Sequence, residues 1–428
     1  MSSNDLTLGS IATIIDCEHK TAPETENEIY AFSVGTRALT NNTIDVNSCK
    51  PVDEQTYKLW SRRGEVEEGD IILAREAPVG GVGLVKSLSP KYCLGQRTVL
   101  IKPKTDVVNS YYLNYLLQSD AVQGWFTDMS TGSTVLHLNV GDIKKLPIPN
   151  LPSMQQQQRI AEILNNLEAK INLNKTIAGS LEDMAQEIFK SWFIDFDPVK
   201  AKMAGEKPAS LDEETAALFP DSMEETELGL IPKGWKSGQL NSVLKLHKST
   251  VKAGAATESV PYVPVDQIGA KDFFLKNSMP GTEAKTSLVS FKKNDILFGA
   301  MRAYFHKVVL APFDGTTRTT TFVLRAVNHA YLAYSLLCVF QEQAVAYATN
   351  NSQGTTIPYA VWSNSFENYP IVLPTENIAK AFNNLILPMI EYGYSLISEN
   401  QDLAQIRDIL LPRLMSGELQ IPEDKLAS

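Results

Sequence analysis

Apolar residues after Pro152 recur at the spacing of a long amphipathic helix. Ser153 can cap its start, and Pro152 prevents the helix from extending backward. At roughly 1.5 Å per residue, some forty residues make a rod of about 60 Å. We predict a coiled-coil seam along it. The positions at intervals of seven are Ile160, Leu167, Asn174, Leu181 and Ile188.

The same phase returns 222 residues later, so we predict a second long helix near the end of the chain. Two helices with matching seams can bury them against each other, and alternation of globule and helix favours an antiparallel pair. Pro388 and Gly393 should kink or soften the second helix. Asn174 is either a tolerated polar residue or a device that fixes register. The second seam consists of Phe382, Met389, Leu396, Leu403 and Leu410.

The segments that precede the two helices also resemble each other. A polar turn, an apolar strand and an arginine occur in both halves, as do an Arg-Thr pair that opens a β-branched strand, a loop of small residues, and a Leu-Pro pair. Four matches in the same order at nearly constant offset indicate an internal duplication. The first members are Gly69–Gly80, Gly95–Pro103, Ser130–Pro149 and Leu151–Pro152, at offsets of 225, 221, 222 and 222.

Each half is predicted to fold as a mixed α and β globule. The fold class is therefore α+β, with two homologous globules separated by two long antiparallel coiled-coil helices. The segment between the first helix and the second globule is acidic and rich in Pro, Gly and Ala, as in a connector. The predicted boundaries are 1–151 and 233–373 for the globules, 152–195 and 374–428 for the helices with the tail, and 196–232 for the connector.

Three aromatic residues gather where the first helix ends. They either cover the tip of the helix against the second globule or dock a partner protein. These residues are Trp192, Phe193 and Phe196.

Composition agrees with a chain of several domains and a cytoplasmic location. The chain has 428 residues, of which 43% are hydrophobic and 21% are charged. No run of 18 apolar residues is present, and the first ten residues lack the features of a secretory signal. The four cysteines lie far apart, so we expect free thiols and neither disulfides nor a zinc site.

The net charge of −10 taken alone argues against a nucleic-acid partner, but the charge is unevenly distributed. Residues 231–372 hold 14 Lys and Arg against 8 Asp and Glu, a net charge of +6. Residues 195–230 hold 3 against 10, a net charge of −7. Because the local field attracts a polyanion, the second globule remains a candidate for binding one.

No motif for catalysis is found. The phosphate-binding loops GxxxxGK[ST] and GxGxxG, the metalloprotease motif HExxH and the nucleophile motif GxSxG are all missing. The five histidines are scattered and predict no metal site. The segment "DFDPV" at 195–199 resembles the [DN]PP[FYW] motif of amino-methyltransferases but lacks its second proline and its aromatic residue. We therefore predict a chain that is not an enzyme.

Polar residues repeated in both halves suit contacts with DNA. Small-residue loops offer amides and hydroxyls, and arginine is a frequent partner of guanine and phosphate. An ordinary surface ion pair is the alternative for each arginine. The candidate DNA-binding residues are Arg75, Arg97, Thr131, Gly132, Ser133, Thr134, His137, Asn139, Arg302, Tyr304, His306, Arg318, Thr319, Gly354, Thr355 and Thr356.

Four segments make the whole chain resemble a known family. They are "LPIPNLPSMQQQQRIAEILNNLEAKI" at the start of the first helix, "IFKSWFIDFDPVKAKMAG" at its end, "LGLIPKGW" before the second globule, and "LLPRLMSGEL" near the C-terminus. The chain resembles the DNA specificity (S) subunit of type I restriction-modification enzymes.

This resemblance implies two target recognition domains, each reading one half of a bipartite site in double-stranded DNA. It implies no catalysis and no cofactor in this chain. Two methyltransferase (M) subunits, docked on the helices, would bring S-adenosylmethionine, and restriction (R) subunits would bring ATP and Mg.

Two other interpretations stay open from sequence. A coiled-coil adaptor whose globules bind proteins agrees with the acidic net charge, and it would show no salt-dependent binding to duplex DNA. A methyltransferase with its own recognition domain would need a cofactor-binding sheet, for which we find no pattern.

Overall fold

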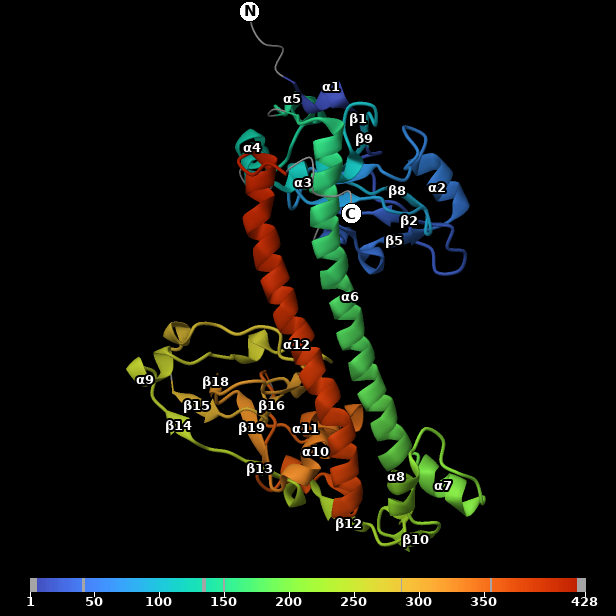
Figure 1. Ribbon diagram of the computed structural model, residues 1–428, viewed down its shortest axis with the longest axis vertical. Coiled ribbons are helices and arrows are strands. Elements are labelled where there is room, and N and C mark those ends of the chain that lie inside the picture. Colours follow the sequence, from blue (N-terminus) through green and yellow to red (C-terminus); the bar gives the residue numbers. More distant parts are fainter. Residues whose placement is uncertain are drawn as a thin grey trace, which may run out of the picture. The chain divides into compact units, whose positions relative to one another are not determined.

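The computed structural model describes residues 6–40, 43–132, 136–148, 151–285, 287–354 and 356–421 (Figure 1). The chain divides into two compact units. Unit 1 comprises residues 1–171 and 402–428, and unit 2 comprises residues 172–401. Two helices of 40 residues each, α6 (Met154–Phe193) and α12 (Glu376–Met415), contribute residues to both units. Among the described helices, none has the length and apolarity that crossing a membrane requires.

A four-stranded antiparallel sheet forms the centre of unit 1. Its order is β1 (Ala12–Asp16), β9 (Thr98–Pro103), β6 (Ile71–Ala74) and β7 (Val82–Leu84). All of β6 is buried because both faces of the sheet are covered, which explains why this strand is continuously apolar. A second sheet contains β5 (Lys50–Val52), β2 (Ala31–Val34) and β8 (Tyr92–Leu94), and β3 (Leu39–Thr40) pairs with β4 (Thr43–Ile44).

Helices pack against the four-stranded sheet of unit 1. Asn109 caps α3 (Ser110–Gln118) by accepting a hydrogen bond from Tyr112 N–H at 3.0 Å. Leu164 of α6 and Leu414 of α12 belong to the same core as the buried face of α3. The other helices of this unit are α1 (Leu8–Ile11), α2 (Glu54–Trp60), α4 (Asp120–Met129) and α5 (Val140–Lys145).

Unit 2 contains a sheet with the same strand order. It runs β13 (Leu244–Leu246), β19 (Thr321–Ala326), β16 (Ile296–Gly299) and β17 (Val308–Leu310). Helices α10 (Leu332–Phe340) and α11 (Glu342–Asn350) follow β19, as α3 and α4 follow β9. Smaller sheets pair β14 (Thr250–Val251), β15 (Leu288–Phe291) and β18 (Gly315–Arg318), and β12 (Lys236–Gln239) with β20 (Pro370–Leu373); α9 is Ala255–Glu258.

The predicted connector is folded. It contains α7 (Asp197–Met203), α8 (Glu213–Leu218) and a hairpin of β10 (Met223–Thr226) and β11 (Gly229–Pro232). Phe219 and Ile231 are buried in the core of unit 2, so this segment is part of that unit and is more than a linker.

Backbone hydrogen bonds at the strand ends repeat in the two units. In unit 1, Arg75 N–H donates to Arg97 C=O at 3.0 Å, and Leu138 N–H donates to Arg75 C=O at 2.9 Å. We call these two bonds the strand-end frame. The frame of unit 2 has lengths of 2.9 and 2.8 Å and joins Ala300, Thr320 and Ala360.

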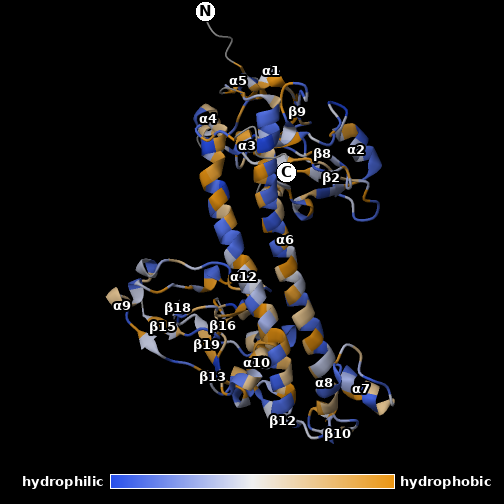
Figure 2. Ribbon diagram, viewed as in Figure 1, coloured by the Kyte–Doolittle hydropathy of each residue, from blue (hydrophilic) through white to orange (hydrophobic). Residues whose placement is uncertain are grey.

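The two long helices contact each other in both units. In unit 1, Arg407 Nη1 lies 2.6 Å from Glu168 Oε1. In unit 2, Asn174 Nδ2 donates to Glu399 Oε2 at 2.8 Å, and Phe382 packs against Phe189 with ring centroids 6.1 Å apart. As residue numbers rise along α6 they fall along α12, so the helices are antiparallel in each unit. Hydrophobic and hydrophilic residues alternate along both helices (Figure 2).

Of the seam residues predicted for α6 and α12, only some lie on the buried face of the helices, and the others lie at its edge. Ile160, Asn174, Phe382 and Leu396 are buried, and the remaining seam residues are half-buried. Full burial of Asn174 and its bonds to α12 favour its role in fixing register. The heptad packing of a coiled coil stays a prediction. The most buried heptad line of α6 is Leu164, Ile171, Ala178, Ala185 and Trp192.

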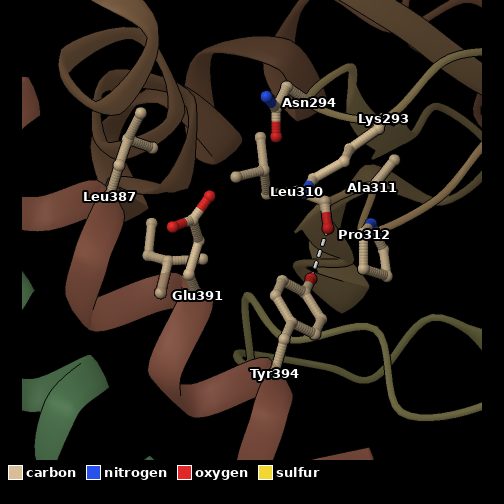
Figure 3. A pocket seen from close by; sticks show the side chains of 9 residues that line it. Lys293, Asn294, Leu310, Ala311, Pro312, Leu387, Glu391 and Tyr394 are labelled. Carbon is tan, nitrogen blue, oxygen red and sulfur yellow. Dashed lines mark hydrogen bonds between the residues drawn. The ribbon is translucent and has the colours of Figure 1, made fainter.

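Helix α12 continues unbroken through Pro388 and Gly393. Gly393 permits close packing, because a Cβ there would lie 2.2 Å from Phe274 Cζ. Beside Gly393, a cavity of about 300 Å³ lies between α12 and the turn that follows β17. Tyr394 closes one side of it and donates its hydroxyl hydrogen bond to Leu310 C=O (Figure 3).

Candidate nucleic-acid interface

Several predicted DNA-binding residues of unit 1 gather around Glu76, which follows β6. Arg97 Nε lies 3.1 Å from Glu76 Oε2, and Arg97 is half exposed. Arg75 Nη2 and His137 Nδ1 lie 3.7 and 3.9 Å from Glu76 Oε1. His137 Nε2 lies 3.0 Å from Asn139 Oδ1. The fold therefore brings together residues from three distant parts of the sequence into one ionic cluster.

Arg75 lies beneath the exposed residues of this cluster and contacts side chains on several sides. Only 7% of the residue is exposed, and Nη2 donates to His19 Nδ1 at 3.1 Å. Its Nε lies 3.9 Å from Asp16 Oδ1. The prediction that Arg75 contacts DNA directly is therefore corrected: its guanidinium is committed to neighbouring side chains beneath the surface.

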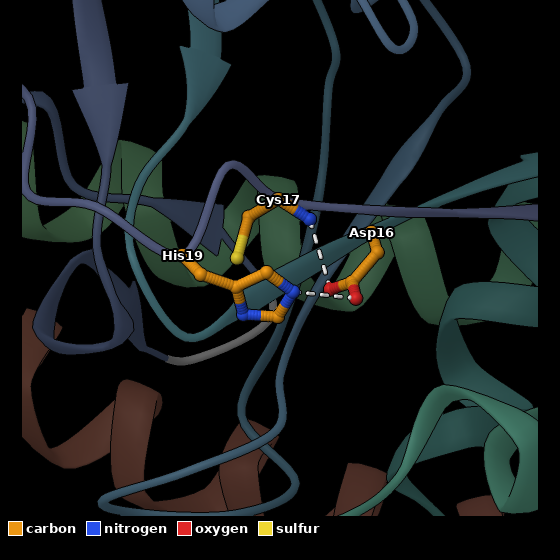
Figure 4. Close-up of side chains that lie close together, drawn as sticks. All are labelled: Asp16, Cys17 and His19. Atoms are coloured by element: carbon orange, nitrogen blue, oxygen red, sulfur yellow. Dashed lines mark hydrogen bonds and ion pairs between the residues drawn. The ribbon is translucent and has the colours of Figure 1, made fainter.

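Asp16, Cys17 and His19 place possible metal-ligating atoms within 4.8 Å of one another (Figure 4). Hydrogen bonds explain this cluster. Asp16 Oδ2 lies 2.9 Å from His19 Nε2, and Asp16 Oδ1 accepts from Cys17 N–H at 2.9 Å. Because the Arg75 guanidinium faces both Asp16 and His19, a metal cation here would be repelled. We assign no metal to this cluster.

The strand-end frame shows that the arginines of the two units do not correspond. Arg75 and Arg97 of unit 1 stand where unit 2 has Ala300 and Thr320. The prediction of matched arginines is therefore wrong. Arg302 lies two residues after Ala300, and Arg318 lies two residues before Thr320, so neither arginine occupies a frame position.

Unit 2 carries a different set of side chains around its frame. Tyr304 is half exposed, Arg302 is partly exposed, and Arg318 is exposed. Tyr359 donates its hydroxyl hydrogen bond to Thr319 C=O, and paired backbone bonds of 2.8 and 2.9 Å between Gln353 and Tyr359 close the loop that contains Gly354 and Thr356. Ser133, Thr134 and Thr355 lie outside the described residues.

His306 is buried, which contradicts its prediction as a DNA contact. Its Nε2–H donates to Phe340 C=O at 2.7 Å. Burial lowers the pKa of His306, so the neutral ring is favoured. Its role is to hold the turn that carries Tyr304.

Comparison with known proteins separates a DNA reader from a protein adaptor. The sequence profile described as the type I restriction modification DNA specificity domain matches residues 4–183 and 232–392. The chain belongs to this family. Its role is DNA sequence recognition as a specificity subunit of a type I restriction-modification system. The two matched segments fall in the two halves of the duplication, which agrees with a two-domain specificity subunit.

Two curated relatives extend over most of the chain. The Type I restriction enzyme MjaIX specificity subunit of Methanocaldococcus jannaschii is 30% identical over 373 residues, which cover 83% of this chain and 79% of the relative. The HindI specificity subunit of Haemophilus influenzae is 24% identical over 403 residues, 83% and 87% of the two chains. The crystal structure of the S subunit from M. genitalium has a TM-score of 0.57 at 14% identity over 97% of both chains, and it supports the fold.

The aromatic end of α6 lies inside unit 2 of this specificity subunit. Trp192 and Phe193 are buried, and Phe382 packs against both rings with centroids 5.5 and 4.9 Å away. Phe196 packs edge-on against Trp235 at 5.8 Å. Of the two interpretations made from sequence, cover against the second globule is confirmed, and partner docking by these residues is corrected because their faces are occupied.

Sequence reasoning missed other residues near the specificity subunit's ionic cluster. Arg37 and Lys50 line a polar cavity of about 330 Å³ together with Arg97. Asp16 and Glu76, which orient the arginines, were also missed. The available signal was their place at strand ends, since Asp16 is the last residue of β1 and Glu76 lies two residues after the buried strand β6.

Proposed function

We propose that this specificity subunit reads a bipartite target in double-stranded DNA, with one half-site for each unit. The observation that carries the proposal is the repeated strand-end frame, which presents different side chains at the same place in the two units. One backbone scaffold with two chemistries suits two different short sequences. Base edges are distinguished by the side chains that reach them.

The surface proposed for unit 1 is centred on Arg97, His137 and Asn139, with the loop at Thr131 and Gly132. In unit 2 it comprises Arg302, Tyr304, Arg318, Thr319, Gly354 and Thr356. The excess of basic residues in 231–372 supports attraction of a polyanion by the second surface. In unit 1, half exposure of Arg97 leaves its guanidinium within reach of a phosphate or guanine.

We also propose that α6 and α12 dock two methyltransferase subunits, with restriction subunits completing the complex. Exposed apolar side chains that share one face of α12, at spacings of three, seven and fourteen residues, support this docking, because gathered apolar surface marks an interaction site. S-adenosylmethionine, ATP and Mg would then be held by partner subunits and none by this chain. The exposed residues are Leu385, Tyr392, Ile406 and Ile409 on α12, and Leu173 and Met184 on α6.

The decisive experiment is selection of target DNA. The full chain is purified with the subunits that accompany it, mixed with a pool of randomised duplexes, and the bound DNA is sequenced. A motif of two conserved blocks with an unconserved spacer is expected, and binding should weaken steeply as salt rises. A single block, or no sequence preference at any salt concentration, would contradict the proposal.

A further inference from the structure

Two adjacent aromatic rings project from one turn of unit 2. The turn is the short 3-10 helix η6 (Ala303–Phe305), which precedes β17. Tyr304 is 51% exposed and Phe305 is 47% exposed, with ring centroids 4.8 Å apart and planes inclined by 52°. Folding leaves this apolar surface in water, and exposed aromatic surface of this kind marks interaction sites.

Backbone contacts hold this turn at both ends. Arg302 and His306, which flank it, have φ angles of 53° and 54°, in the left-handed region that non-glycine residues seldom adopt. Arg302 N–H donates to Pro358 C=O at 2.8 Å, and Lys271 N–H donates to His306 C=O at 2.8 Å. Such backbone conformations persist only where surrounding structure determines them.

The His306 side chain anchors the turn from the inside. Its ring is buried, bonds to Phe340 C=O at 2.7 Å and lies edge-on to the Phe340 ring at 4.9 Å. Ala303 is buried as well. The two exposed rings therefore stand on a fixed base, so little conformational freedom is lost when they bind a partner.

One basic residue and the small-residue loop adjoin the turn that carries the two rings. Arg302 precedes the turn and is partly exposed. Pro358, bonded to Arg302, follows exposed Ile357 and the small-residue loop with Gly354. Proteins that unstack base pairs insert apolar side chains between them and contact the neighbouring phosphates with polar or basic groups. At the same distance after the strand-end frame, unit 1 has Val79 and Gly80 and therefore lacks a pair of aromatic rings there.

We propose that Tyr304 and Phe305 form an aromatic wedge that enters between two neighbouring base pairs and unstacks them. This inference rests on the proposed function, because it concerns the half-site that unit 2 reads. Pyrimidine–purine steps unstack most easily, so the wedge would favour such a step without a hydrogen bond to either base. Unit 2 would thus read deformability as well as base edges.

The test places the fluorescent base 2-aminopurine at successive positions of a duplex obtained by the selection described above. With the full chain and its accompanying subunits, fluorescence should rise several-fold at one step in one block. Tyr304→Ala and Phe305→Ala should each abolish this rise and weaken binding about tenfold. Phe305→Leu, which keeps an apolar wedge, should retain most of the rise. Leu230→Ala removes an exposed apolar side chain elsewhere in unit 2 and should change neither measurement.

Two outcomes would overturn the wedge while leaving the proposed function intact. One is sequence-specific binding by the unaltered chain with no rise at any position. The other is a full rise in the double variant Tyr304→Ala, Phe305→Ala. Failure of the selection to give any preferred sequence would instead contradict the proposed function and the wedge together.

Discussion

Units 1 and 2 share a backbone scaffold but carry different side chains around the strand-end frame. Around the frame of unit 1 lie Arg75, Glu76, Arg97 and His137, linked by ionic contacts. The frame of unit 2 contains alanine and threonine instead, and aromatic rings stand nearby. Since backbone bonds define the scaffold, side chains at its edge can change without altering the fold. A duplicated domain can thereby acquire a second specificity.

The same contrast appears where the long helices enter each core. Phe382 of α12 packs against three aromatic rings of α6 in unit 2, whereas the matching position of α6 in unit 1 is the aliphatic Ile160. Phe382→Ala should lower the free energy of unfolding by about 3–5 kcal/mol. Ile160→Ala should cost about 2–4 kcal/mol, because less buried surface is lost. Urea unfolding of both variants checks this order, and equal losses would remove the contrast.

Close packing of α12 in unit 2 gives a second prediction. Gly393→Ala should lower the free energy of unfolding by about 1–3 kcal/mol, because the added Cβ overlaps the Phe274 ring. Gly179→Ala is the matched control: this glycine also lies in a long helix, but nothing approaches its Cβ position within 4 Å. It should be neutral or stabilise by up to about 1 kcal/mol. Calorimetry of both variants measures the difference, and a harmless Gly393→Ala would refute the packing argument.

Arg97→Ala tests whether the ionic unit reads DNA independently of the aromatic one. Binding should weaken by about 1–3 kcal/mol, or discrimination should relax, only in the half-site read by unit 1. Thr320→Ala alters the equivalent frame position in unit 2 and should affect only the other half-site. Selection experiments with each variant separate the two effects. Loss of discrimination in the wrong block would contradict the assignment.

Glu182 of α6 gives unit 2 a pH dependence. Burial and the nearby Asp272 carboxylate raise its pKa from 4.5 to about 7. The folded state therefore binds this proton more tightly than the unfolded state, and stability falls as pH rises from 4.5 to 7. Glu182→Gln should be more stable than the unaltered protein by about 3 kcal/mol at pH 8, with the gain vanishing below pH 4.5. Urea unfolding at both pH values checks this, and a gain independent of pH would exclude the titration.

Sequence periodicity predicted both forty-residue helices and the duplication, because these depend on local spacing. It placed the seam imperfectly, since the core of the first globule as well as the partner helix buries Leu164. It also left docking of a partner by Trp192 and Phe193 as one alternative. The connector and Trp235 pack over these rings, and this contact between distant segments leaves no periodic pattern in the sequence. His306 and Arg75 were misjudged because burial of single polar residues depends on tertiary contacts.

The contact between Gly393 and Phe274 has a mechanical consequence. Because Gly393 has no side chain, the helix contacts the Phe274 ring directly at this position. If α12 shifted by one residue or rotated about its axis, the side chain of Tyr392 or Tyr394 would overlap that ring. The part of α12 that belongs to unit 2 therefore cannot slide along the surface on which it packs. Any force applied to it is transmitted to the segment that carries Phe274.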